Sequence, residues 1–162
     1  MSTHSRIDTT LYLSAAAAVI LALAAVGWSV VAHRPPQQYA AGERFDDIPN
    51  LNVSAAPSTL IIWVDSRCGP CTASMPFYQR LTGQTHRTRL VVMGREPTQD
   101  LKDYLAEFGV RPAQIISVGD RVLKFKGTPT VVLIGADSIV RAVWYGRRQT
   151  ATEEEDIIKR LD

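Results

Sequence analysis

The only two cysteines among the 162 residues are spaced so that they could form a reversible disulfide. Cys68 and Cys71 follow the apolar run Leu60–Val64 and precede a segment that reads as a helix. In a cysteine at the first turn of a helix, unpaired backbone N–H groups and the helix dipole favour the thiolate. A second cysteine one turn later can close a small ring with it. The residue types and their spacing therefore predict thiol–disulfide exchange.

A pair of cysteines two residues apart also occurs as half of a zinc site, which needs four ligands when it is structural. Outside the apolar N-terminal region the chain offers the two cysteines, His86 and, in a predicted tether, His33. These are too few for a closed site. We predict no metal and no other cofactor.

A long uncharged segment lies near the N-terminus. Residues 11–32 contain no charged side chain, and 22 helical residues at about 1.5 Å each span roughly the 30 Å of a bilayer core. This segment predicts a transmembrane anchor after a short tail of residues 1–10. Small residues at Val30–Ala32 leave signal-peptide cleavage open, but the apolar run exceeds the usual 7 to 15 residues, roughly, of a cleaved signal.

The anchor is predicted to be followed by a tether and one domain. Residues 33–47 are polar and contain two prolines, as in an extended linker, and residues 48–162 carry the apolar runs of a folded core. The 18 basic and 16 acidic residues give a net charge of +2 without a basic block, which argues against nucleic-acid binding.

Apolar periodicity predicts alternating strands and helices in the domain, hence a three-layer α/β sandwich. A loop with at most one short edge strand is expected over 47–57, and a helical turn over 120–125. The predicted strands are Ser58–Val64, Arg89–Gly94, Gln114–Val118, Val131–Ile134 and Ile139–Tyr145. The predicted helices are Thr72–Leu81 with a kink at Pro76, Thr98–Phe108, and a last helix opened by a capping box from Thr152 to Glu155.

This order of elements resembles the thioredoxin fold over about Ile48 to Asp162. The residues that carry the resemblance are Cys68-Gly69-Pro70-Cys71, Pro76, Gly127-Thr128-Pro129-Thr130 and Gly146. The material from Arg89 to Val118 is similar to the insert of the membrane-anchored TlpA/ResA-like branch. The resemblance implies that Pro129 is cis and that its loop, with Thr128, faces the cysteines.

The sequence departs from the family at three positions. Arg67 stands where the family has tryptophan before the first cysteine. The two family acids fall on Ile62 and Ser74, which leaves Asp65 as the nearest carboxylate that could take the proton of Cys71. We expect Arg67, Gly69, Pro70 and Asp65 to tune the pair.

The resemblance implies a membrane-anchored thiol–disulfide oxidoreductase. Cys68 would attack a disulfide of a protein substrate and Cys71 would resolve the mixed disulfide. Relatives of this branch mostly act as reductants, for example on apocytochrome or metal-site cysteines, and a membrane electron donor would restore the dithiol. The expected location is the cytoplasmic membrane of a bacterium, with a single pass and the domain on the periplasmic side. The alternative is a non-catalytic thioredoxin-fold module that docks a partner or carries a metal.

Overall fold

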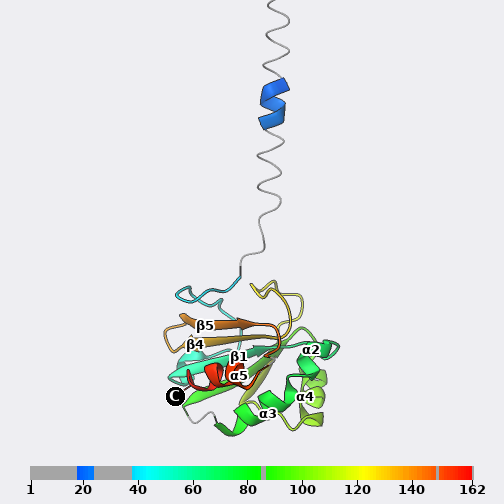
Figure 1. The fold of residues 1–162 in the computed structure, drawn as a ribbon, viewed down its shortest axis with the longest axis vertical. Coiled ribbons are helices and arrows are strands. Elements are labelled where there is room, and N and C mark those ends of the chain that lie inside the picture. The colour runs from blue at the N-terminus through cyan, green and yellow to red at the C-terminus, as the bar shows by residue number, and fades with distance from the viewer. Residues whose placement is uncertain (1–17, 24–37, 85–86, 149, 162) are drawn as a thin grey trace, which may run out of the picture. The chain divides into compact units, whose positions relative to one another are not determined.

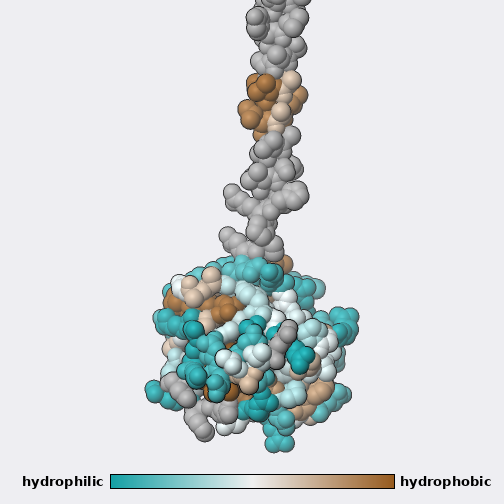
Figure 2. Space-filling view, viewed as in Figure 1, coloured by the Kyte–Doolittle hydropathy of each residue, from teal (hydrophilic) through white to brown (hydrophobic). Residues whose placement is uncertain are grey.

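The computed structural model describes residues 18–23, 38–84, 87–148 and 150–161. The chain divides into two units, Met1–Pro36 and Gln37–Asp162. In the first unit, residues 18–23 are helical, and their large apolar side chains are exposed (brown in Figure 2). Most of the predicted anchor lies outside the described residues. Within those described, no helix has both the length and the apolar character that a membrane span requires.

The described part of the second unit is built on a five-stranded sheet of order β3-β2-β1-β4-β5. Strands β1, β2 and β3 are parallel to one another. Strand β4 is antiparallel to β1, and β5 is antiparallel to β4; Figure 1 labels these three strands. The strands are β1 (Ser58–Trp63), β2 (Thr88–Gly94), β3 (Gln114–Ser117), β4 (Thr130–Gly135) and β5 (Val140–Tyr145). Each predicted strand is confirmed to within a few residues.

Burial on both faces explains why the central strands read as continuous apolar runs. In β1, Leu60 and Ile62 belong to the core on one face of the sheet, and Ile61 and Trp63 to the core on the other. Strand β2 divides in the same way, so the middle of the sheet has no solvent-facing side.

All the described helices of this unit that bury apolar side chains do so on one face of the sheet. They are α2 (Gly69–Thr72), α3 (Met75–Gln84), α4 (Thr98–Glu107) and α5 (Ala151–Ile158). Their buried residues, such as Leu81, Leu101 and Ile157, share a single core with Leu60 and Ile62. The second α-helical layer of the predicted three-layer sandwich is therefore absent from the described residues of this unit.

The second face is covered by segments without α-helix. Tyr39 and Phe45 from the N-terminal side are buried there with Leu123 and half-buried Phe125, while Val53 of the short 3-10 helix η1 (Val53–Ala55) packs at the margin. The Tyr39 ring lies 4.6 Å from that of Phe45 and 5.1 Å from that of Phe125. The sequence predicts an unpacked tether through residue 47, but from Tyr39 onward the chain is part of the folded unit.

Two helix boundaries differ from the prediction for local reasons. The kinked helix is instead broken into α2 and α3, because Pro76 has no N–H to continue the ladder and the Ser74 hydroxyl binds the Pro70 carbonyl at 2.8 Å. The capping box of α5 joins Thr150 to Glu153, two residues earlier than predicted.

Two loops also differ from the prediction. Residues 120–125 contain a turn but no helix, and residues 47–57 contain η1 but no strand. An isolated β-bridge joins Arg44 to Ile139 instead. Backbone pairing in the N-terminal segment therefore occurs outside the predicted loop.

Candidate active site

The two cysteines lie just beyond the carboxyl end of β1, where α2 begins. Cys68 is the N-cap residue of α2 and is partly exposed, and its sulfur accepts the backbone N–H of Cys71 at 3.2 Å. Both cysteines are free thiols in this structure. The predicted arrangement of a strand, an accessible first cysteine and a helix is therefore present.

Cys71 is fully buried, and burial raises the pKa of its thiol to about 12. The neighbouring Cys68 side chain raises it further, whereas the backbone N–H of Asp65 and the side chain of Thr128 act in the opposite direction. A low-polarity site disfavours the thiolate, so Cys71 is held protonated near neutral pH.

The loop predicted to face the cysteines does so. The Cys68 thiol donates to the Thr128 carbonyl at 3.5 Å, and the Thr128–Pro129 peptide bond is cis, as the resemblance implies. The loop is fixed from two sides, since the Thr130 hydroxyl binds the Gly127 carbonyl at 2.6 Å and the Gly146 N–H binds the Pro129 carbonyl at 2.8 Å. Thr128 therefore interacts with both thiols: its carbonyl accepts the Cys68 thiol, and its side chain lowers the pKa of Cys71.

Two of the predicted tuning residues interact with one another. Asp65 Oδ1 accepts the backbone N–H of Arg67 at 2.8 Å and lies 3.6 Å from the Arg67 Nε atom. The Arg67 side chain is 85% exposed, so solvent screens its charge. Asp65 acts on Cys71 through its backbone, and its carboxylate contacts Arg67. Its role as the acceptor of the Cys71 proton stays a prediction.

The residues between the cysteines have different roles in the helix start. Gly69 is exposed and has room for a Cβ atom, so its place in the fold does not depend on lacking a side chain. Pro70 stands in the first turn of α2, where a missing N–H costs no helical bond, and its carbonyl accepts the Ser74 hydroxyl.

Sequence reasoning missed one carboxylate near the site, that of Glu96. Its Oε1 atom accepts the backbone N–H of Ser66 at 2.6 Å, two residues before Cys68. Its Oε2 atom is buried and has no hydrogen-bond partner among the described residues. The sequence does contain an indication of Glu96, which comes just after the predicted strand Arg89–Gly94. This strand is parallel to β1, so the two strands end at the same edge of the sheet, beside the cysteines.

Comparison with solved structures matches this architecture to redox proteins. A protein described as a DsbE-type thiol:disulfide interchange protein from Chlorobium tepidum superposes with a TM-score of 0.61 at 18% identity, covering 76% of this chain and 96% of its own. A thiol-disulfide isomerase from Corynebacterium glutamicum gives 0.54 at 15% identity, with 80% and 96% coverage.

A second thioredoxin-family interchange protein from Chlorobium tepidum gives a TM-score of 0.55 at 20% identity and covers 80% of this chain and 98% of its own. The chain has a thioredoxin-like fold. No protein-family model matches the sequence, and neither does any curated protein. The assignment of a thioredoxin-like fold therefore rests on the structure. The two thiols lie where the sequence pattern predicts them.

Proposed function

We propose that this thioredoxin-fold chain is a membrane-anchored thiol–disulfide oxidoreductase that reduces disulfides of proteins outside the cytoplasm. The observation that carries the proposal is the asymmetry of its two thiols. Cys68 is accessible, and its sulfur accepts a hydrogen bond from the backbone N–H of Cys71, whereas Cys71 is buried and protonated. An accessible attacking thiol and a shielded resolving thiol are what a two-step exchange requires.

In the first step, the Cys68 thiolate attacks one sulfur of a substrate disulfide. A bond forms between Cys68 and that sulfur, the substrate S–S bond breaks, and the leaving thiolate takes up a proton. The Cys71 N–H, 3.2 Å from the Cys68 sulfur, stabilises the negative charge that this sulfur carries as a thiolate before the attack.

In the second step, Cys71 loses its proton and attacks the Cys68 sulfur. A disulfide forms between Cys71 and Cys68, the mixed disulfide breaks, and the leaving substrate thiolate takes up a proton. The substrate has then gained two electrons, which the Cys68–Cys71 pair has lost. A membrane electron donor would then reduce the pair again. Because Cys71 has a pKa of about 12, its deprotonation is the step that the surroundings of the site must assist.

The direction of electron flow and the location belong to the same proposal. Gly69-Pro70 between the cysteines is the pair found in reducing thioredoxins, which have potentials of about −270 mV, whereas strong oxidants lie near −120 mV. The uncharged residues 11–32, and the exposed apolar side chains at 18–23, support an anchor in a bacterial cytoplasmic membrane.

A redox titration and two cysteine variants test the function. We expect a potential well below about −150 mV, and a higher value would overturn the reducing direction. Cys68→Ser should abolish exchange, whereas a docking module would keep its partner and its phenotype. Cys71→Ala should accumulate mixed disulfides with the natural substrates, and the double variant Cys68→Ser/Cys71→Ala should trap none.

A further inference from the structure

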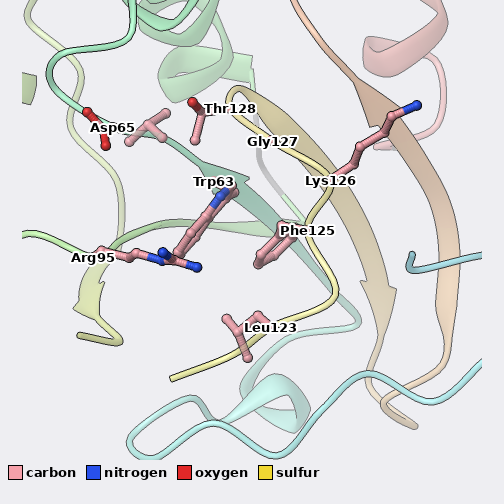
Figure 3. A pocket seen from close by; sticks show the side chains of 9 residues that line it. Trp63, Asp65, Arg95, Leu123, Phe125, Lys126, Gly127 and Thr128 are labelled. Atoms are coloured by element: carbon pink, nitrogen blue, oxygen red, sulfur yellow. The ribbon is translucent and has the colours of Figure 1, made fainter. Parts of the chain in front are cut away.

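A hollow beside the candidate active site has no part in the exchange steps. Its volume is about 250 Å³, and it lies between the ends of β1 and β2 and the connection that leads to Thr128. It opens on the side of the sheet that no described α-helix covers. Its walls include Trp63, Asp65, Arg95, Leu123, Phe125 and Thr128 (Figure 3).

The hollow is next to the reacting sulfur, because Thr128 lines it and its carbonyl accepts the Cys68 thiol at 3.5 Å. Thr128 also lines a second, more apolar groove, together with Gly69, Pro70 and Tyr145. A protein chain joined to Cys68 by a disulfide therefore has two hollows next to Thr128 that can receive its neighbouring side chains.

The hollow combines an apolar wall with a cation. The rings of Trp63 and Phe125 stack at 4.7 Å with an interplanar angle of 11°. Figure 3 shows the Arg95 guanidinium directed toward Trp63 and Leu123, whereas the Lys126 ammonium points away from them. No hydrogen bond or ion pair joins the Arg95 side chain to another residue in the described part of the chain.

The carboxylate at the rim does not neutralise this cation. Asp65 faces Arg67, whose Nε lies 3.6 Å away, and it also accepts the Arg67 backbone N–H. Glu96, next in sequence to Arg95, binds the Ser66 N–H instead. The Arg95 guanidinium is therefore left to interact with an incoming anionic group.

We propose that this hollow binds an acidic side chain of the protein substrate, close in sequence to the cysteine that reacts with Cys68. The inference rests on the proposed function and adds a substrate class to it. A guanidinium can hold a carboxylate through two hydrogen bonds, and the methylene groups of a glutamate fit the Trp63–Phe125 wall. A cavity of about 250 Å³ is smaller than the roughly 300–1,000 Å³ of small-molecule sites, which favours a single side chain.

The test measures the rate at which the reduced, full-length protein in detergent reduces peptide disulfides. The peptides carry Glu, Gln or Lys at one to three residues from one cysteine and are otherwise identical. We expect the best Glu peptide to react about 2- to 5-fold faster than its Gln counterpart, which is the usual range for an exposed ion pair. Raising the salt to about 1 M should remove most of this preference.

Arg95→Gln should abolish the preference for Glu, and Arg111→Gln should retain it. Arg111 is the matched control because it lines a separate hollow beside Thr88, at the amino end of β2. Hydroxyethyl disulfide, which has no charge, should be reduced equally by the wild type and Arg95→Gln.

The proposal is overturned if the wild type shows no preference, if Arg95→Gln keeps the preference, or if this variant also slows the reduction of hydroxyethyl disulfide. A wild-type protein that reduces no disulfide at all would refute the proposed function, and the substrate class with it. These two failures are distinguished by hydroxyethyl disulfide alone.

Discussion

The two thiols lie in different surroundings although only two residues separate them. Cys68 is partly exposed at the start of α2, and Cys71 has no solvent-accessible surface. Their place at the start of a helix predicts an accessible Cys68, but the complete burial of Cys71 depends on tertiary packing that the spacing of the two cysteines does not show. The exposure of each sulfur agrees with the roles that the resemblance implies, in which Cys68 attacks and Cys71 resolves.

We predict that iodoacetamide labels Cys68 and leaves Cys71 unmodified in the native, reduced protein at pH 8. The thiolate is the reactive form, and a pKa of about 12 leaves a negligible fraction of Cys71 as thiolate at that pH. Mass spectrometry of the labelled peptides checks this. Denatured protein, in which both cysteines should react, is the control, and double labelling of the native protein would contradict the assignment.

The same pKa predicts a loss of stability at high pH. The pKa of Cys71 is raised from 9.0 to about 12, so the folded state retains a proton that the unfolded state has released. This contribution to stability is complete below about pH 9 and is lost as the pH rises toward 12. Denaturant unfolding of the reduced protein should show a larger decline over this window than unfolding of Cys71→Ala.

Glu96 gives a third prediction, on the loop that precedes Cys68. Glu96→Ala removes the acceptor of the Ser66 N–H and should lower the free energy of unfolding by about 1–3 kcal/mol. Glu96→Gln keeps an acceptor oxygen and should cost less. Denaturant titrations of the two variants check the difference, and equal losses would show that the negative charge, and not the hydrogen bond, stabilises the loop.

At the scale of elements, long apolar runs made the strands predictable. Ile61 and Val91 lie on central strands where both faces are buried, and α4 has a clear helical periodicity. The cover of the second face was not predictable in this way. Tyr39 and Phe45 are isolated aromatic residues in a polar stretch, and they are buried only because Phe125 and β5 reach them from the far end of the chain.

The strength of this cover can be measured with two variants. Phe45 is 4% exposed, so Phe45→Ala should cost about 3–5 kcal/mol by leaving a cavity on the second face. Val122, which precedes buried Leu123 in the opposite half of the cover, is 88% exposed, and Val122→Ala should change the stability by about 0.5 kcal/mol or less. Thermal or denaturant unfolding of both checks the contrast. A Phe45→Ala loss as small as that of Val122→Ala would show that the cover adds little.

At the scale of the whole molecule, the proposal places residues 11–32 in a membrane and the folded unit on its outer side. We predict that carbonate washing leaves the protein in the membrane fraction and that deletion of residues 11–32 releases it. Added protease should degrade the folded unit in spheroplasts but spare it in intact cells. A cytoplasmic protein that stays intact in the same spheroplasts is the control, and protection of the folded unit would reverse the proposed orientation.

The contacts of the first folded residues have a consequence for the order in which the unit assembles. The Gly42 N–H binds the Val140 carbonyl at 2.8 Å, and the Tyr145 hydroxyl binds the Tyr39 carbonyl across 106 positions of sequence. Contacts between such distant residues require the closure of a long loop and form slowly. A chain emerging from the ribosome therefore cannot complete the pairing of Tyr39 and Gly42 with β5 until this late strand has been synthesised.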